Sequence, residues 1–223
     1  MKIVGHRGAR GLAPENTIAS LQKALEHHVD ELEFDLRVTK DNVVILNHSS
    51  LLADASGARL TIRNYGYAEL KAHKPDLATF EEVLETIGHS VPLYVEVKRG
   101  EPTGPIIKIL KKYLANGWQP GHFLLGSKIQ KTLLQLHTAL PEIPTIVIEP
   151  WSGVRAHYRA RQLDTKLVSV NQHWLWWGFI RGFKNNGWQL YAYTLNNPAK
   201  ARRWARYGLT GVVTDYPDRF EKQ

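Results

Sequence analysis

The sequence predicts a single-domain α/β protein built as a closed (β/α)8 barrel. Apolar strand-like runs alternate with segments of helical periodicity along the chain, and eight such strand–helix steps can be counted. Strands separated by helices indicate βαβ units and a parallel sheet. A series of eight favours closure into a barrel over an open sheet, and the length of 223 residues is ordinary for one barrel domain.

The elements follow one another regularly. Pro14 precedes the first helix, in which Ile18, Leu21 and Leu25 form one apolar face. Thr79 is expected to cap a later helix, with Glu82 completing a capping box. Only eight residues follow Asp215, so the last helix must be short or missing. The predicted strands cover 2–4, 31–36 with 43–47, 92–97, 123–126, 144–148, 167–170, 187–195 and 209–215, and the helices cover 15–28, 80–87, 106–117, 127–137, 153–162, 174–184 and 199–208.

Residues 49–77 interrupt this alternation after the second barrel strand. They mix Gly, Ser and Asn with a short helical piece around Tyr67–Lys71, which is typical of a compact insertion. The chain contains no internal repeat, low-complexity segment or linker that would divide it. We therefore expect one domain over residues 1–223, with the insertion inside it.

The composition narrows the class of protein. At 43% hydrophobic and 22% charged residues, the chain is ordinary for a globular protein. It has no cysteine, which excludes disulfides, thiolate nucleophiles and cysteine-based zinc or iron–sulfur sites. The formal net charge is +8, but the basic residues are spread along the chain rather than gathered in one block. We therefore expect no nucleic-acid partner.

The sequence also bears on location. It contains no apolar run of about 18 residues or more, so no transmembrane helix is expected. The first residues enter a strand-like segment without the apolar region of a signal peptide. We expect a cytoplasmic protein.

Two acids stand out on the second strand. Glu33 and Asp35 are two residues apart, and side chains at that spacing leave the same face of an extended strand. Two anions held so close share a proton or a cation, and Mg²⁺ or Ca²⁺ would accept these oxygen ligands. The alternative is an exposed strand face with solvated acids. A turn at 39–42 and a further strand then lead to His48.

The companions of these acids favour a functional site. In a barrel, function collects at the carboxyl ends of the strands. Three carboxylates, two histidines, one arginine and one lysine are expected to face the same mouth. The residues at or after strand ends are His6, Arg7, Glu33, Asp35, His48, Glu96, Lys98, Ser127, Glu149, Asn171, Thr194 and Asp215.

This set suggests cleavage of a phosphoester. A divalent ion on Glu33, Asp35 and Glu96 would bind a phosphate oxygen and neutralise developing charge. Arg7 and Lys98 offer donors to phosphate. His6 and His48 can divide general acid and general base work, because imidazole titrates near neutral pH.

The ordered motifs resemble the signature of the glycerophosphodiester phosphodiesterase family, over essentially the whole chain. The length and the stretch YAYTLNNPAKA are most similar to short cytosolic bacterial members. The matching motifs are His6-Arg7-Gly8 with Pro14-Glu15-Asn16-Thr17, Glu33-x-Asp35, Thr39-Lys40-Asp41, His48, Thr79-Phe-Glu-Glu-Val-Leu84, Glu96-x-Lys98 and Gly211-Val-Val-Thr-Asp215-x-Pro217.

The resemblance implies a TIM barrel, one divalent cation (Mg²⁺ or Ca²⁺) and hydrolysis of glycerophosphodiesters to sn-glycerol 3-phosphate and an alcohol. It leaves open whether water or the glycerol 2-hydroxyl attacks phosphorus first, the latter giving a cyclic phosphate. Glu15 and Asn16 are expected mainly to shape the loop and cap the first helix. By position, the metal ligands match Glu33, Asp35 and Glu96, the acid/base pair matches His6 and His48, and the phosphate-side residues match Arg7 and Lys98.

Two positions depart from the family pattern. Ser49 stands where the family usually has an Asp directly after the second histidine, and a hydroxyl orients an imidazole more weakly than a carboxylate. Tyr193 stands where the family often has Trp, which keeps an aromatic wall and adds a hydroxyl.

A tryptophan-rich stretch, 173–181, follows the sixth strand. On a helix over 174–184, Trp174 and Trp177 would share one face and Trp176 another. These rings either pack on the barrel and a neighbouring helix, or they wall the active-site mouth or make weak contact with a membrane surface, since Trp favours such interfaces. The second reading favours an alternative function, a lysophospholipase D-like phosphodiesterase. A barrel that only binds phosphorylated ligands is a third hypothesis, which Ser49 supports and the two histidines oppose.

Overall fold

The computed structural model describes residues 1–54, 57 and 59–220. Each barrel strand pairs in parallel with the next, and β1 pairs with both β11 and β2, so the sheet closes. The predicted (β/α)8 barrel is confirmed. Its strands are β1 (Lys2–Gly5), β2 (Glu31–Val38), β6 (Leu93–Val97), β7 (Phe123–Ser127), β8 (Thr145–Glu149), β9 (Leu167–Asn171), β10 (Gln189–Tyr193) and β11 (Gly211–Thr214).

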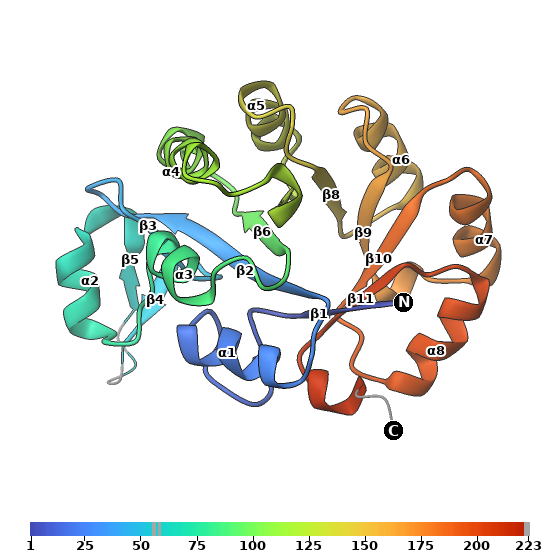
Figure 1. Cartoon of the computed structure of the whole chain (residues 1–223), viewed down its shortest axis with the longest axis horizontal. Coiled ribbons are helices and arrows are strands. Elements are labelled where there is room, and N and C mark those ends of the chain that lie inside the picture. Colours follow the sequence, from blue (N-terminus) through green and yellow to red (C-terminus); the bar gives the residue numbers. More distant parts are fainter. Residues whose placement is uncertain (55–56, 58, 221–223) are drawn as a thin grey trace.

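Helices surround these strands (Figure 1). The strand β11 is followed by a short 3-10 turn over Pro217–Phe220, as the few remaining residues require. The predicted capping box is present, since Thr79 Oγ1 accepts from the Glu82 amide and the Glu82 carboxylate accepts from the Thr79 amide. The barrel helices are α1 (Ile18–Glu26), α3 (Phe80–Ile87), α4 (Thr103–Ala115), α5 (Gln130–Ala139), α6 (Gly153–Arg161), α7 (Trp177–Asn185) and α8 (Pro198–Tyr207).

The apolar core has an inner and an outer part. Inside the barrel, the rings of Tyr94 and Tyr191 meet edge to face at 6.5 Å, in a cluster that includes Val4, Ile146 and Val213. The outer part lies between the strands and the surrounding helices. Because β2 is buried along its whole length, any acid on it sits in a low-dielectric setting.

The described residues of the predicted insertion (49–54, 57 and 59–77) pack together with the preceding strand β3 around a small core. β3 (Val44–Leu46) pairs antiparallel with β2, and β4 (Leu51–Ala53) forms a hairpin with β5 (Arg59–Thr61). A 3-10 turn over Ile62–Asn64 and α2 (Tyr67–His73) complete it. This unit lies beside α3 at the periphery (Figure 1). Its buried apolar residues are Ile45, Leu52, Ile62, Leu70 and Leu77.

The helix predicted from Trp174 begins three residues later, so the predicted pairing of tryptophans on its faces is wrong. Residues Gln172–Trp174 form a separate 3-10 turn, in which the Asn171 side chain accepts from the His173 amide. Leu175 then adopts an extended backbone and buries its side chain, and α7 starts at Trp177.

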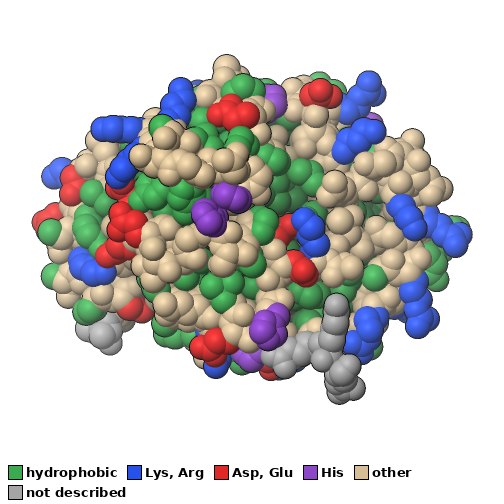
Figure 2. Space-filling view, viewed as in Figure 1, with side chains coloured by type: hydrophobic (Ala, Val, Ile, Leu, Met, Phe, Trp, Pro, Cys, Tyr) green, Lys and Arg blue, Asp and Glu red, His purple; other side chains and the backbone are tan. Residues whose placement is uncertain are grey.

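Two observations concern the surface. On the face shown in Figure 2, Lys and Arg side chains are dispersed around the edge and do not form one continuous basic surface. Among the helices in the described part of the chain, none has the length and apolar character needed to cross a membrane.

Candidate active site

The loop after β1 places His6 and Arg7 over the barrel. Gly8 has φ +81, and a Cβ there would lie 2.4 Å from the Ser20 carbonyl carbon, so the loop can pack on α1 only with glycine. The Arg7 backbone N–H donates to Glu33 Oε2 at 2.8 Å. The first motif is thereby tied to the acidic strand.

Three buried carboxylates converge beneath this loop. Glu33 and Asp35 come from β2, and Glu96 comes from β6, where it is the register partner of Asp35. They are 4%, 1% and 7% exposed. One oxygen from each lies within 4.8 Å of the others, a group that could hold a metal ion.

Cations surround the acids unevenly. Lys98 Nζ donates to Asp35 Oδ1 at 2.9 Å and to Glu96 Oε1 at 2.8 Å. Arg7 Nε lies 3.2 Å from Asp35 Oδ2, and Lys128 Nζ lies 3.3 Å from Glu96 Oε1. The side chain of Glu33 accepts the Arg7 backbone N–H but has no ion pair in the described part of the chain closer than 4.0 Å.

The electrostatics of the two β2 acids differ accordingly. Burial raises the pKa of Glu33 well above its usual value, and the charges of Asp35 and Glu96 raise it further. Burial would also raise the pKa of Asp35, but Lys98 and Arg7 hold it well below its usual range. Of the two, Glu33 is therefore the acid whose charge is less compensated, with Arg7 as the one cation that lowers its pKa among the causes of the shift.

The donor set fits a hard divalent cation. Its oxygens are all carboxylate, as Mg²⁺ and Ca²⁺ prefer, and no sulfur ligand is available in the sequence. A cation here would add positive charge beside Glu33. The three carboxylates thus fit the divalent cation that the sequence implied.

His6 is held by the opposite end of the chain. His6 Nδ1 lies 2.5 Å from Asp215 Oδ1, beyond the last barrel strand. Asn196 Nδ2 donates to Asp215 Oδ2 at 2.8 Å, and the Asp215 amide donates back to Asn196 Oδ1. The bonds from His6 and Asn196 lower the pKa of Asp215, although burial opposes this. Because Asp215 is an anion, Nδ1 must donate, which leaves Nε2 free to act on a substrate.

His48 is positioned through its backbone. Arg37 Nη2 donates to the His48 carbonyl oxygen at 2.9 Å, and Arg37 Nη1 donates to Glu101 Oε1 at 2.9 Å. The Ser49 hydroxyl accepts from the Leu51 amide, and it forms no hydrogen bond to the His48 imidazole in the described part of the chain. This buried ion pair, rather than the residue after the histidine, fixes His48 here.

The surroundings of His48 favour its neutral form. Burial and the charges of Lys98, Arg7 and Lys128 together lower the pKa of His48 to about 3, against the opposing effect of Asp35. The imidazole is therefore neutral at pH 7 and can accept a proton.

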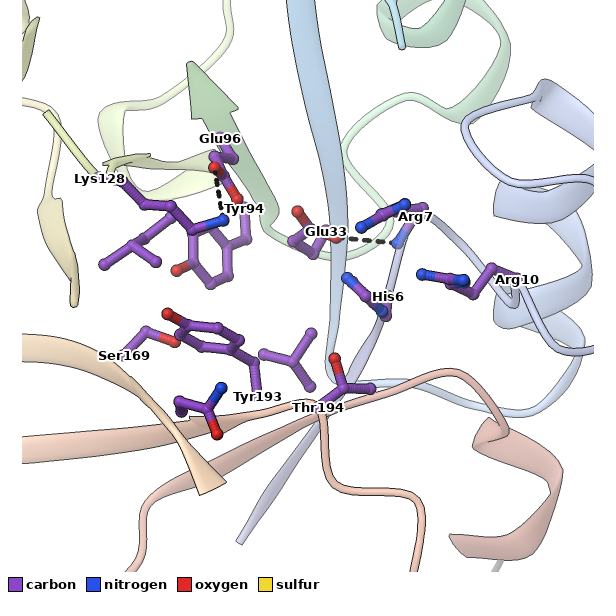
Figure 3. A pocket seen from close by; sticks show the side chains of 13 residues that line it. His6, Arg7, Arg10, Glu33, Tyr94, Glu96, Lys128, Ser169, Tyr193 and Thr194 are labelled. Atoms are coloured by element: carbon purple, nitrogen blue, oxygen red, sulfur yellow. Dashed lines mark hydrogen bonds and ion pairs between the residues drawn. The ribbon is translucent and has the colours of Figure 1, made fainter. Parts of the chain in front are cut away.

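An open cavity faces these groups (Figure 3). Glu33, His6 and the two arginines lie on one side of the view, and Tyr193, Ser169 and Thr194 lie on another. His48, Asp35 and Lys98 adjoin the cavity but are not among its lining residues. The lining is His6, Arg7, Arg10, Glu33, Tyr94, Glu96, Lys128, Ile148, Ser169, Asn171, Tyr193, Thr194 and Val213.

The structure therefore gathers the predicted residues in one place. Hydrogen bonds and ion pairs link Arg7, Glu33, Asp35, Glu96 and Lys98 to one another, His6 enters the same cavity, and His48 lies within electrostatic reach.

Sequence reasoning missed several partners. Asn16 does not cap α1, because Thr17 does so by accepting from the Ser20 amide. Instead Asn16 Nδ2 donates to Asp35 Oδ2 at 3.1 Å and Asn16 Oδ1 accepts from the Asp35 amide. Lys128 was also missed, although its place directly after a strand end was a usable signal.

The fold and the site define a barrel phosphodiesterase. The chain belongs to the glycerophosphoryl diester phosphodiesterase family, whose model matches residues 6–219.

Individual relatives agree with this assignment. The chain is 29% identical to a glycerophosphodiester phosphodiesterase of Bacillus subtilis, over 98% of this chain and 85% of the relative. It is 30% identical to a lysophospholipase D of Mus musculus, over 97% of this chain and 80% of the relative. An Oleispira antarctica phosphodiesterase, solved in complex with the product sn-glycerol-3-phosphate, has the same fold, with a TM-score of 0.85, 23% identity and coverage of 98% and 94%.

Proposed function

We propose that this protein hydrolyses glycerophosphodiesters to sn-glycerol 3-phosphate and an alcohol. The observation that carries the proposal is the convergence of three buried carboxylates, two histidines and several cations at one cavity, in a chain of this family. A pure binding site would need the cations but not a histidine held by Asp215. For that reason we prefer an enzyme to a binding barrel.

One divalent cation, Mg²⁺ or Ca²⁺, would be held by Glu33, Asp35 and Glu96. When bound, it supplies positive charge that offsets the charge developing on the phosphate oxygens. Arg7 and Lys98 are proposed to bind the phosphate side of the substrate, with Lys128 as a further cation at the cavity wall. Asn16 would keep Asp35 in place.

The histidines would divide the proton transfers. Asp215 stabilises the protonated imidazole of His6, so His6 is proposed to donate a proton to the leaving alcohol oxygen. His48, which is neutral, would accept the proton of the attacking hydroxyl. That hydroxyl belongs either to water or to C2 of the glycerol, and the two routes differ in whether a cyclic phosphate forms.

The proposal is tested by release of glycerol 3-phosphate from glycerophosphocholine, with and without EDTA. We expect release that chelation abolishes and that added Mg²⁺ or Ca²⁺ restores. Full activity after exhaustive chelation would contradict the metal site. Absence of release, with lysophosphatidylcholine cleaved, would favour the second candidate below.

The second candidate is a lysophospholipase D-like activity at a membrane surface. Trp151, Trp176 and Trp177 are 67%, 57% and 58% exposed, and Trp174 is exposed beside them. They sit in the loops after β8 and β9 and at the start of α7, at the carboxyl ends of barrel strands. Trp174 Nε1 donates to the Pro150 carbonyl oxygen at 2.8 Å, which joins the two loops.

The segment that carries this aromatic rim (Trp151, Trp174, Trp176 and Trp177) is basic in sequence, although Arg159 within it is buried and paired with Glu149. Residues 150–185 contain six Lys or Arg and one Asp. Exposed tryptophans with basic neighbours suit an anionic lipid surface. Membrane contact through the rim would bring an acyl-bearing substrate to the mouth.

A further inference from the structure

Two hydroxyls in the cavity have unused hydrogen-bonding capacity. The Tyr193 hydroxyl and Ser169 Oγ are both shielded from solvent; within residues 1–54, 57 and 59–220 the first has no hydrogen-bond partner, and the second has only a poorly aligned contact with the Tyr94 hydroxyl. Ser169 is fully buried. Both residues line the cavity, and Figure 3 shows their oxygens next to the Tyr94 hydroxyl, on the wall opposite Arg7.

Such groups call for an explanation. A buried hydroxyl that has given up water without gaining a partner costs free energy, and most buried polar groups are satisfied. This cost is removed in a working enzyme if the substrate supplies a partner to the Tyr193 hydroxyl and completes the bonding of Ser169. A hydroxyl both donates and accepts, so its natural complement is another hydroxyl.

The cavity wall that carries Tyr193 and Ser169 lies beside Lys128, one of the cations proposed to face the phosphate. The Lys128 ammonium sits over the Tyr193 ring, 5.7 Å from its centroid, and the same ammonium lies 3.3 Å from Glu96 Oε1. A group esterified to a phosphate bound near Glu96 and Lys128 would therefore be within reach of Tyr193.

Tyr193 differs from the residue that the family resemblance predicts at this position. The resemblance noted above expects Trp where this chain has Tyr193. An indole offers one donor and no acceptor, whereas the phenol offers both. Tyr193 can therefore both donate and accept a hydrogen bond at this wall, whereas Trp could only donate one.

We propose that the Tyr193 and Ser169 hydroxyls bind the terminal hydroxyl of the glycerol group and make the enzyme selective for diesters that carry it. This inference rests on the proposed glycerophosphodiesterase function. A site built to bond a substrate hydroxyl rejects the analogue that lacks it, because the site's own groups are then left unpaired.

The test compares choline release from glycerophosphocholine and from 2-hydroxypropyl phosphocholine. The analogue keeps the hydroxyl next to the phosphate-bearing carbon and lacks the terminal one. For the wild type we expect kcat/KM to favour glycerophosphocholine by roughly 10- to 100-fold. Tyr193→Phe should reduce that ratio to within about threefold of unity while keeping activity on the analogue, and Ser169→Ala should reduce it in part.

Tyr158→Phe is the matched control, since this tyrosine is exposed on α6 and its change should leave the ratio unaltered. A wild-type ratio near one, or an unchanged ratio in both Tyr193→Phe and Ser169→Ala, would overturn the inference without contradicting the proposed function. Failure of the wild type to release choline from either substrate would overturn the proposed function and the inference with it. Retained activity on the analogue shows that a variant is folded.

Discussion

His6 and Asp215 are hydrogen-bonded at 2.5 Å although 209 positions separate them in the sequence. The bond joins the loop after the first barrel strand to the residue after the last, across the seam where the barrel closes. Asn196 holds the other carboxylate oxygen. The histidine nearest the cavity is thus aligned only when the barrel is complete.

This pair predicts that Asp215→Asn lowers kcat by about 100-fold or more, with a smaller effect on KM, because the imidazole loses both its orientation and its counter-charge. Steady-state kinetics over pH 5–9 measures both constants. Asp76→Asn, on the surface beside Lys74, is the control and should change neither.

The same pair predicts a pH dependence of stability. The pKa of Asp215 is lowered in the folded protein by its bonds to His6 and Asn196, with burial opposing. A depressed folded pKa stabilises the protein above the unfolded pKa, and this contribution is lost as pH falls through the folded pKa. The difference in Tm between wild type and Asp215→Asn should therefore be larger at pH 7 than near pH 3. An equal difference at both values would contradict the assignment.

Glu33→Gln should abolish activity without lowering the stability of the fold. Because burial and two neighbouring anions raise the pKa of Glu33, its ionised form destabilises the metal-free protein as pH rises above the unfolded pKa. Gln retains an oxygen for the Arg7 amide and removes the charge. We expect loss of activity and of Mg²⁺ or Ca²⁺ binding by calorimetry, with a Tm in EDTA that is unchanged or higher.

Glu81→Gln, which changes an exposed acid on α3 paired with Lys112, provides the comparison. It should leave metal binding intact. A Glu33→Gln protein that unfolds at a much lower temperature in EDTA would show that the carboxylate is a structural group.

His48→Ala should abolish turnover while leaving the fold intact. General acid–base catalysis contributes roughly 10²- to 10⁴-fold, and the side chain has no hydrogen bond within the described residues whose loss would destabilise the protein. Circular dichroism, Tm and choline release measure the two effects. His28→Ala, at an exposed histidine after α1, should behave as wild type, and normal turnover by His48→Ala would refute the acid–base assignment.

The aromatic rim predicts a change in substrate preference. Trp174→Ala and Trp177→Ala should lower the rate on lysophosphatidylcholine in anionic vesicles by several-fold and leave glycerophosphocholine hydrolysis unchanged, because only the first substrate needs the lipid contact. Leu134→Ser, at an exposed apolar site on α5, is the control. Equal rates for all variants on both substrates would remove the rim from the mechanism.

The sequence by itself predicted the barrel and most of the residues that gather at the cavity. Alternation of apolar strands with helical segments is local, and so is the i, i+2 spacing of Glu33 and Asp35, which places both on one face whatever the rest of the chain does. Thr79 and Glu82 form their capping box within one helical turn. Such features can be predicted from the sequence because they depend only on residues that are close together along the chain.

Only the tertiary structure decided which groups hold the site together. Asn16 bonds Asp35, Arg37 with Glu101 holds His48, and Asp215 holds His6, each across loops or strand ends that barrel closure brings together. The start of α7 at Trp177 depends likewise on burial of Leu175 against the barrel. Strand spacing fixes where a side chain points, but its hydrogen-bond partner depends on how distant strands register in three dimensions, and no local pattern encodes that.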